Sequence, residues 1–170
     1  CASSKTSIAL AFVVKQRGLK KTIAITSEKN KAFTKSLDCY DEVISYDEVK
    51  TLDNAQKIMI VDMAGHYDAM KDLHEHFGDH VKYSCKVGAT HLDNLKGDTS
   101  QFPGAKPTFF FAPTQAQKRT EEWGAGEVQK RISMSLKEFQ IHSDQWMTVK
   151  RYSGLDEIKN TFTEVVQGNI

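Results

Sequence analysis

The chain has 170 residues, which is within the usual range of one domain and enough to bury a core without cross-links. Hydrophobic residues make up 39% and charged residues 26%, a composition that excludes a disordered or fibrous chain. The 23 Lys and Arg against 22 Asp and Glu leave a formal net charge of +1. Such a balance gives no long-range field for a nucleic acid or an anionic membrane, so we expect neither as a partner.

The cysteines and the apolar runs indicate the compartment. Cys1, Cys39 and Cys85 are an odd number without a CxxC pair, which argues against a disulfide framework and against a zinc knuckle. No apolar run reaches the length of a membrane span, and the first residues lack the basic region and cleavage site of a signal peptide. We therefore expect a reducing, cytoplasmic setting.

Strands and helices are expected to alternate through the first half of the chain. Apolar residues at helical density predict a helix over residues 4–18, which Ser3 or Ser4 caps and Gly18 ends. Further along, the pattern predicts strands at 22–26, 42–46, 58–61 and 81–87, a helix from the polar turn 27–30 to about residue 37, and a helix at 67–77. This alternation predicts an α/β fold with a doubly wound, mostly parallel, Rossmann-like sheet.

The second half begins with a polar, turn-rich segment at residues 89–105, a length typical of lids and binding loops. After it the pattern predicts a strand at 108–112, a long helical region from 114 past 139, a strand at 147–149 and a helix at 155–166. We expect all 170 residues to form one dinucleotide-binding domain.

The predicted first helix has no strand before it, although a βαβ fold feeds its phosphate-binding helix from a central buried strand. A sheet without that strand leaves backbone groups unpaired, which is costly. We therefore expect the domain to lack its first strand, so that the chain is a fragment or pairs with a missing segment.

The start of the first helix is the first candidate site. Ser3, Ser4, Lys5 and Thr6 offer hydroxyl groups, an ammonium group and the unpaired N–H groups of a helix N-terminus, which together suit a pyrophosphate. The alternative is that the hydroxyls only cap the helix and that Lys5 is a solvated charge. The position at the first βα turn of this fold favours the phosphate site.

The turn after strand 22–26 predicts which cofactor is bound, because a Rossmann domain meets the adenosine ribose there and an acidic residue prefers NAD. Thr26 and Ser27 end this strand instead, with Lys29 and Asn30 close behind, a set that suits the 2′-phosphate of NADP. Glu28 does not fit this interpretation, and a simple helix cap is the alternative.

Three histidines, His74, His76 and His80, suggest a metal site at first sight. Residues two apart on a helix point about 200° apart and cannot share an ion. We therefore expect a solvated helix face and no bound metal.

A nucleoside triphosphatase is a second class to weigh. Ser4-Lys5-Thr6 is similar to the end of a P-loop, and the segment from Asp62 to His66 is similar to the DxxGH segment of GTPases. However, Ser4 stands where a P-loop needs glycine, and no NKxD segment follows. This class is therefore less favoured.

Several segments resemble, in order, an uncharacterised domain family related to the medium-chain dehydrogenase/reductases. They are ASSKT with its apolar helix, TSEKNKAF, SLDCYDEVISY, IVDMAGH, VGATHLD, KPTFFFAP and KRTEEWG. Members look like quinone-reductase or enoyl-reductase relatives, in which a GroES-like N-terminal domain precedes a Rossmann domain with SASSKT in place of the glycine fingerprint. The resemblance covers nearly the whole chain, and the GroES-like domain is absent from it.

The resemblance implies a cofactor-binding set. It places Ser3, Ser4, Lys5 and Thr6 at the pyrophosphate, Ser27, Lys29, Asn30 and Tyr46 around the adenosine and its 2′-phosphate, Met63, Ala64 and Gly65 beside the cofactor, and Gly88, Ala89 and Thr90 near the nicotinamide. It also places Phe109 to Phe111 near the carboxamide and a dimer edge. Because Ser4 replaces a glycine of the fingerprint, its side chain would hold helix and strand farther apart and weaken the binding of the cofactor.

These observations lead us to expect an NADP-dependent oxidoreductase, a homodimer that transfers hydride between the nicotinamide and a small carbonyl, enone or quinone substrate. No catalytic residue is assigned, and Tyr46, Thr90 and His91 are the candidates. The alternative from another class is a non-catalytic nucleotide-binding or interaction domain that kept the fold and lost the chemistry.

Overall fold

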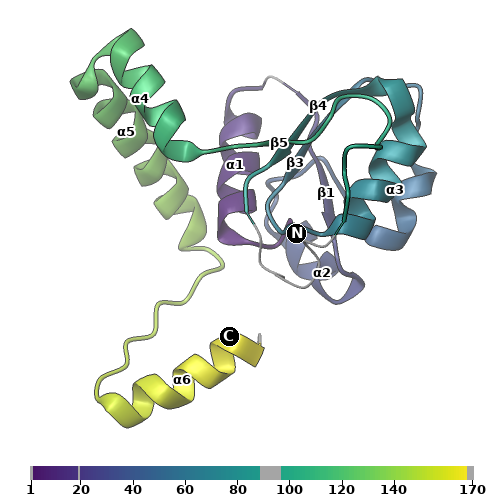
Figure 1. Ribbon diagram of the computed structural model, residues 1–170. Helices are drawn as coiled ribbons and strands as arrows, with labels where there is room; N and C mark the ends of the chain where they lie inside the picture. Colours follow the sequence, from purple (N-terminus) through teal and green to yellow (C-terminus); the bar gives the residue numbers. More distant parts are fainter. Residues whose placement is uncertain (1, 19, 89–96, 168–170) are drawn as a thin grey trace. The chain divides into compact units, whose positions relative to one another are not determined.

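The computed structural model describes residues 2–18, 20–88 and 97–167, and the chain divides into two units, residues 1–139 and 140–170. Helices and strands alternate along the first unit (Figure 1). They are α1 (Lys5–Gln16), β1 (Ile23–Thr26), α2 (Glu28–Ser36), β2 (Glu42–Ser45), the short 3-10 helix η1 (Tyr46–Thr51), β3 (Ile58–Asp62), α3 (Tyr67–Phe77), the 3-10 turn η2 (Gly78–His80), β4 (Val81–Lys86), β5 (Thr108–Phe109) and α4 (Ala112–Trp123). Helix α5 (Ala125–Ser143) continues into the second unit, which also contains α6 (Leu155–Gln167).

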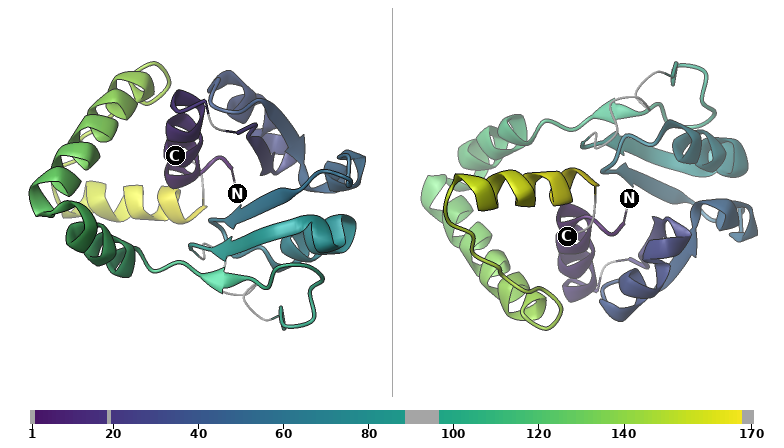
Figure 2. Two further views of the ribbon diagram at one scale, coloured as in Figure 1. Left: turned by 90° about the horizontal axis from the view of Figure 1, so that it is seen from above. Right: turned by 90° about the horizontal axis from the view of Figure 1, so that it is seen from below.

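The strand pairs of the described residues are all parallel, and they form two sheets. In the first, β1 pairs with β2 so that Ile23 lies opposite Glu42 and Thr26 opposite Ser45. In the second, β4 lies between β3 and β5, and β3 and β4 run side by side in the same direction (Figure 2). Among the described residues no ladder joins β1 to β3. Parallel strands with helical connections confirm the predicted α/β class and are consistent with a Rossmann-like arrangement.

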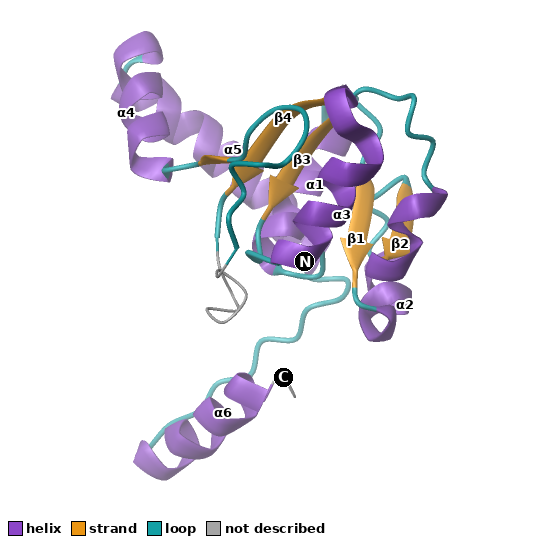
Figure 3. Ribbon diagram, turned by 45° about the vertical axis from the view of Figure 1, so that its right-hand side comes forward, coloured by secondary structure: helices purple, strands orange, loops and turns teal. Residues whose placement is uncertain are grey.

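Helices α1 and α3 lie on opposite sides of the strands (Figure 3). The α3 side carries the main core, to which both sheets contribute. Its buried members are Ile44, Val49, Ile60, Met70, Leu73, Phe77, Val81 and Phe102. Alternate residues of β1 explain the two faces, because Ile23 and Ile25 pack against this core while Ala24 packs against Ala2 and Val43. One core therefore fixes both sheets under α3.

The segment that leads into α1 lies beside β1. The backbone N–H of Ala2 donates to the Ile25 carbonyl at 3.1 Å, and the Tyr40 hydroxyl donates to the Ala2 carbonyl at 2.8 Å. Ile8, Ala11 and Phe12 form the buried side of α1. These contacts position the beginning of α1 next to the carboxyl end of β1.

Three predictions about the second half are wrong. The expected strand at 147–149 is irregular, and Val149 is 75% exposed, because no neighbouring strand of the described part pairs with it. The expected long helix is interrupted at Gly124, whose φ of 80° ends α4. The strand expected at 108–112 stops at Phe109, since α4 begins at Ala112 with a proline in its first turn.

The described helices include none that is both long enough and apolar enough to span a membrane.

Candidate functional site

The residues before and in the first turn of α1 have separate roles. Ser4 is the N-cap, and its Oγ accepts a hydrogen bond from the Ser7 backbone N–H at 3.3 Å. Ser3 is half-buried, and its Oγ accepts a bond from Nδ2 of Asn30 at 3.2 Å. Lys5 and Thr6 are exposed at the start of the helix. The capping interpretation therefore holds for Ser4, while Lys5 and Thr6 point outward from the positive end of the helix dipole.

The turn from β1 into α2 presents polar groups at the carboxyl end of the sheet. Thr26 is fully buried, Ser27 is half-buried as the N-cap residue of α2, and Lys29 is exposed in the first turn. The Ser3 to Asn30 hydrogen bond joins this turn to the beginning of α1. Two of the predicted segments, residues 3–6 and 26–30, therefore lie next to each other.

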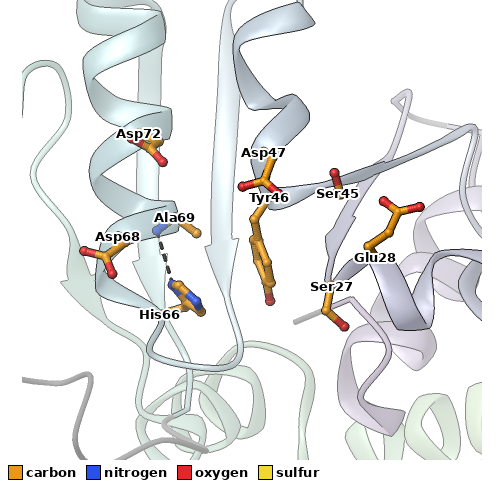
Figure 4. Close-up of a pocket in the computed structure, with 9 residues that line it drawn as sticks. All are labelled: Ser27, Glu28, Ser45, Tyr46, Asp47, His66, Asp68, Ala69 and Asp72. Atoms are coloured by element: carbon orange, nitrogen blue, oxygen red, sulfur yellow. Dashed lines mark hydrogen bonds between the residues drawn. The ribbon is translucent and has the colours of Figure 1, made fainter.

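A cavity of about 350 Å³, which we call the first cavity, opens at the carboxyl ends of β1 and β2 and the amino end of α3 (Figure 4). It is lined by Ser27, Glu28, Ser45, Tyr46, Asp47, His66, Asp68, Ala69 and Asp72. The rings of Tyr46 and His66 stack with 4.7 Å between their centroids and 28° between their planes. His66 is held as the N-cap of α3, where its Nδ1 accepts from the Ala69 N–H at 3.3 Å. The stacked pair gives the cavity a fixed aromatic wall.

Negative charge dominates the lining of the first cavity, because Glu28, Asp47, Asp68 and Asp72 all contribute carboxylates. The pKa of Tyr46 is raised by burial and by the charge of Asp62, so its hydroxyl stays protonated. A ligand group in this cavity must therefore be neutral, cationic or held by cations at its edge.

The cations of α2 are divided between two environments. Lys31 forms an ion pair and hydrogen bond with Glu48 and lies 3.7 Å from Glu28. The Lys31 contact, together with a bond from the Ser45 backbone N–H, lowers the pKa of Glu48 to about 2. Lys31 therefore links α2 to η1 through Glu48, whereas Lys29 is exposed to solvent.

A second cavity of about 390 Å³ opens at the carboxyl ends of β3 and β4. The segment between β3 and α3 separates it from the first cavity, because Gly65 lines the second and His66 lines the first. Oδ1 of buried Asp62 shapes this segment by accepting the N–H groups of Ala64 at 2.9 Å and Gly65 at 3.0 Å. Gly88 is also part of the lining, and a β-carbon there would lie 2.8 Å from the Met63 carbonyl oxygen.

Comparison with protein families matches residues 1–170 to a family described as a protein of unknown function (DUF2855). The chain belongs to the DUF2855 family. Comparison with curated proteins and with solved structures finds no match.

The DUF2855 chain brings most of the predicted site residues to one edge of its sheets. Ser27 and Tyr46 line the first cavity, Ser3 bonds to Asn30 beside it, and Gly65 and Gly88 line the second cavity. Ala64 is buried in the turn of Asp62, and Thr26 is buried at the end of β1. Thr90, Ala89 and the candidate His91 lie outside the described residues.

Sequence reasoning missed His66, Asp62 and Lys86 as lining residues. The signal for His66 and Asp62 was their position in the segment between a buried strand and a helix, of which only Met63, Ala64 and Gly65 were predicted to lie beside the cofactor. Lys86 stands at the end of β4 and carried no signal of its own.

The three histidines of the DUF2855 chain that suggested a metal site bond to separate groups, and the expected solvated helix face is wrong for His74, whose ring is completely buried against β4 and the Pro103 carbonyl. His74 bonds to the Pro103 carbonyl and the Ser84 hydroxyl, at 2.8 and 2.9 Å, His76 bonds to the Leu52 carbonyl at 2.8 Å, and His80 to the Asn54 carbonyl at 2.5 Å. Within the described residues no group of three or more His, Cys, Asp or Glu is placed to hold a metal ion.

Proposed function

We propose that the protein is a cytoplasmic oxidoreductase that binds NADP and transfers hydride between its nicotinamide and a small carbonyl, enone or quinone. The observation that carries the proposal is the first cavity at the carboxyl ends of β1 and β2, with its Tyr46 and His66 wall and with residues 3–6 beside it. In open α/β sheets ligands bind in the crevice outside the carboxyl ends of the strands. The resemblance to medium-chain dehydrogenase/reductases supports hydride transfer as the reaction.

The first cavity suits the adenosine half of the cofactor. Its volume of about 350 Å³ is in the range of small-molecule sites, and the aromatic wall offers a face for the adenine ring. The acidic lining suits a neutral base and ribose hydroxyl groups, which donate hydrogen bonds to carboxylates.

The 2′-phosphate then belongs at the turn from β1 into α2, outside the acidic lining. Thr26 and Ser27 end the strand in place of the acidic residue that favours NAD, and exposed Lys29 supplies a cation. Glu28 opposes this binding, but it is 76% exposed and lies 3.7 Å from the Lys31 ammonium group, which offsets its charge.

The other half of the cofactor follows the sheet edge. The pyrophosphate lies at the N-terminus of α1, where Lys5 and Thr6 are exposed and the helix dipole is positive. The nicotinamide lies beyond Gly65, towards Gly88, where glycines let the ring approach the backbone closely.

Calorimetric titration of the protein with NADPH, NADH and ADP-ribose tests the binding, and NADPH oxidation with a panel of quinones and enones tests the reaction. We expect NADPH to bind most tightly and to be oxidised by at least one acceptor. Binding without turnover would favour the alternative of a nucleotide-binding domain without catalysis, and no binding by any of the three would overturn the proposal.

A further inference from the structure

The second cavity contains a lysine that none of the roles above uses. Lys86 ends β4 in register with Asp62 of β3, so the two side chains start from neighbouring positions at the carboxyl edge of the sheet. Lys86 is half-buried, and among the described residues its Nζ donates a hydrogen bond to Oγ1 of Thr99 at 3.1 Å. An ammonium group has three N–H donors, so this bond fixes its position without using its full capacity.

Within the described ranges, Lys86 has no acidic partner close by. No carboxylate of those residues lies within ion-pair distance of its Nζ. Asp62 lines the same cavity, but its Oδ1 already accepts two backbone N–H groups, which hold the carboxylate in the turn after β3. A half-buried ammonium group beside apolar surface favours a ligand oxygen that can accept its remaining N–H bonds.

The rest of the second cavity is largely apolar, and its Tyr67 wall is held by packing. Tyr67, Met70, Val87 and Phe109 form its walls. The Tyr67 ring lies 5.5 Å from the Phe102 ring between centroids, and it packs on Gly97 so closely that a β-carbon there would come within 1.8 Å of the ring. Such a cavity suits a small hydrophobic molecule with a single polar group.

We propose that the second cavity binds the reducible substrate, a small, mostly apolar carbonyl compound whose oxygen accepts a hydrogen bond from Lys86. The inference rests on the proposed function, and it makes Lys86 a catalytic residue. NADPH, when bound, would supply a hydride to the β-carbon of an enone and leave as NADP⁺, and the electron pair of the C=C bond would shift towards the substrate oxygen. Lys86 would stabilise the negative charge on that oxygen through its N–H bonds, and a proton from water at the α-carbon would complete the saturated ketone.

Binding of cyclohexenone to the protein without cofactor tests this inference apart from the dinucleotide. We measure its dissociation constant by NMR titration and the carbonyl stretching frequency of the bound molecule by infrared spectroscopy. We expect binding, with a carbonyl band at lower frequency than in water, and with cyclohexene binding more weakly because it lacks the oxygen. Lys86→Met should weaken cyclohexenone binding about tenfold or more and return the band towards its value in an apolar solvent.

Lys82→Met is the matched control, because Lys82 lies on the same strand but is exposed and bonds to the Asp79 carbonyl. It should leave both readings unchanged, and circular dichroism shows whether Lys86→Met is folded. If that variant does not fold, Lys86→Arg and Lys86→Gln replace it: the charged donor of Arg should keep the band shift, and the neutral amide of Gln should reduce it. A band that does not depend on residue 86, or no cyclohexenone binding at all, overturns the inference even if NADPH binds. If cyclohexenone binds through Lys86 and NADPH does not bind, the site stands and the dinucleotide proposal falls.

Discussion

The side-chain amide of Asn30 donates a hydrogen bond to the Ser3 hydroxyl oxygen at 3.2 Å. This bond joins the segment before α1 to the first turn of α2, so that the N-termini of both helices lie at the carboxyl end of β1. The positive ends of two helix dipoles are thereby held side by side. In the proposed function one end faces the pyrophosphate and the other faces the 2′-phosphate.

Lys5→Ala should weaken NADPH binding without changing the fold. An exposed ammonium group contributes little to stability, whereas a charge-assisted bond to a phosphate is worth enough to change affinity about tenfold or more. Titration calorimetry and thermal unfolding measure the two effects. Lys20→Ala is the control, because Lys20 is also exposed but lies outside the helices. An unchanged NADPH affinity in Lys5→Ala would mean that Lys5 is a solvated charge without a phosphate contact.

Lys29 and Glu28 should have opposite effects on cofactor choice. Lys29→Ala removes the exposed cation at the 2′-phosphate and should lower the ratio of NADPH to NADH affinity about tenfold. Glu28→Gln removes a negative charge at the same turn and should raise that ratio, by less because Glu28 is exposed and screened. Lys35→Ala, in the last turn of α2, is the control. Equal affinities for NADPH and NADH in the unaltered protein would contradict the choice of NADP.

The sequence predicted the elements of the α/β part well because each has a strong local signal. Strand and helix periodicity placed β1 to β4 and α1 to α3 within a few residues of their bounds. The same reasoning failed at 147–149, where the triplet Met-Thr-Val has no strand beside it in the described part of the chain, and at Gly124, where one residue with positive φ divides a helix. Stacking of Tyr46 on His66 and the position of Lys86 depend on packing between distant segments, which no local pattern encodes.

Two glycine substitutions should change stability in opposite directions. Gly104 has a φ of 75°, and a β-carbon there would lie 2.3 Å from the Gly78 carbonyl oxygen. Gly104→Ala should therefore lower the free energy of unfolding by about 2 kcal/mol or more, because the left-handed conformation and the backbone contact both oppose it. A β-carbon at Gly126 would meet no atom within 4 Å, and alanine favours a helix more than glycine does. Gly126→Ala should therefore raise the free energy of unfolding by about 0.5 kcal/mol. Urea unfolding measures both, and a neutral Gly104→Ala would show that the turn at Gly104 can shift.

His74 should make the fold sensitive to mild acid. The ring is completely buried, and its Nδ1 donates to the Pro103 carbonyl, so that Nε2 of the neutral ring accepts from the Ser84 hydroxyl. Burial lowers the pKa of His74 below its ordinary value of 6.5. The unfolded chain therefore binds a proton that the folded chain does not, and the stability of the fold decreases as the pH falls through about 6.5.

The expected slope is at most about 1.4 kcal/mol of unfolding free energy per pH unit, between about pH 7 and pH 5. Urea unfolding across this window measures it. His74→Gln should lower the stability at neutral pH, because the amide fills the ring's place imperfectly, and should remove most of this slope. His80→Gln, whose ring is bonded at the surface to the Asn54 carbonyl, should keep the slope. Glu48, with its pKa lowered to about 2, makes the fold less stable in acid as well, but only below its ordinary carboxyl pKa, so its effect lies in a lower window. An unfolding free energy that does not change between pH 7 and pH 5 would mean that His74 is protonated equally in the folded and unfolded chains.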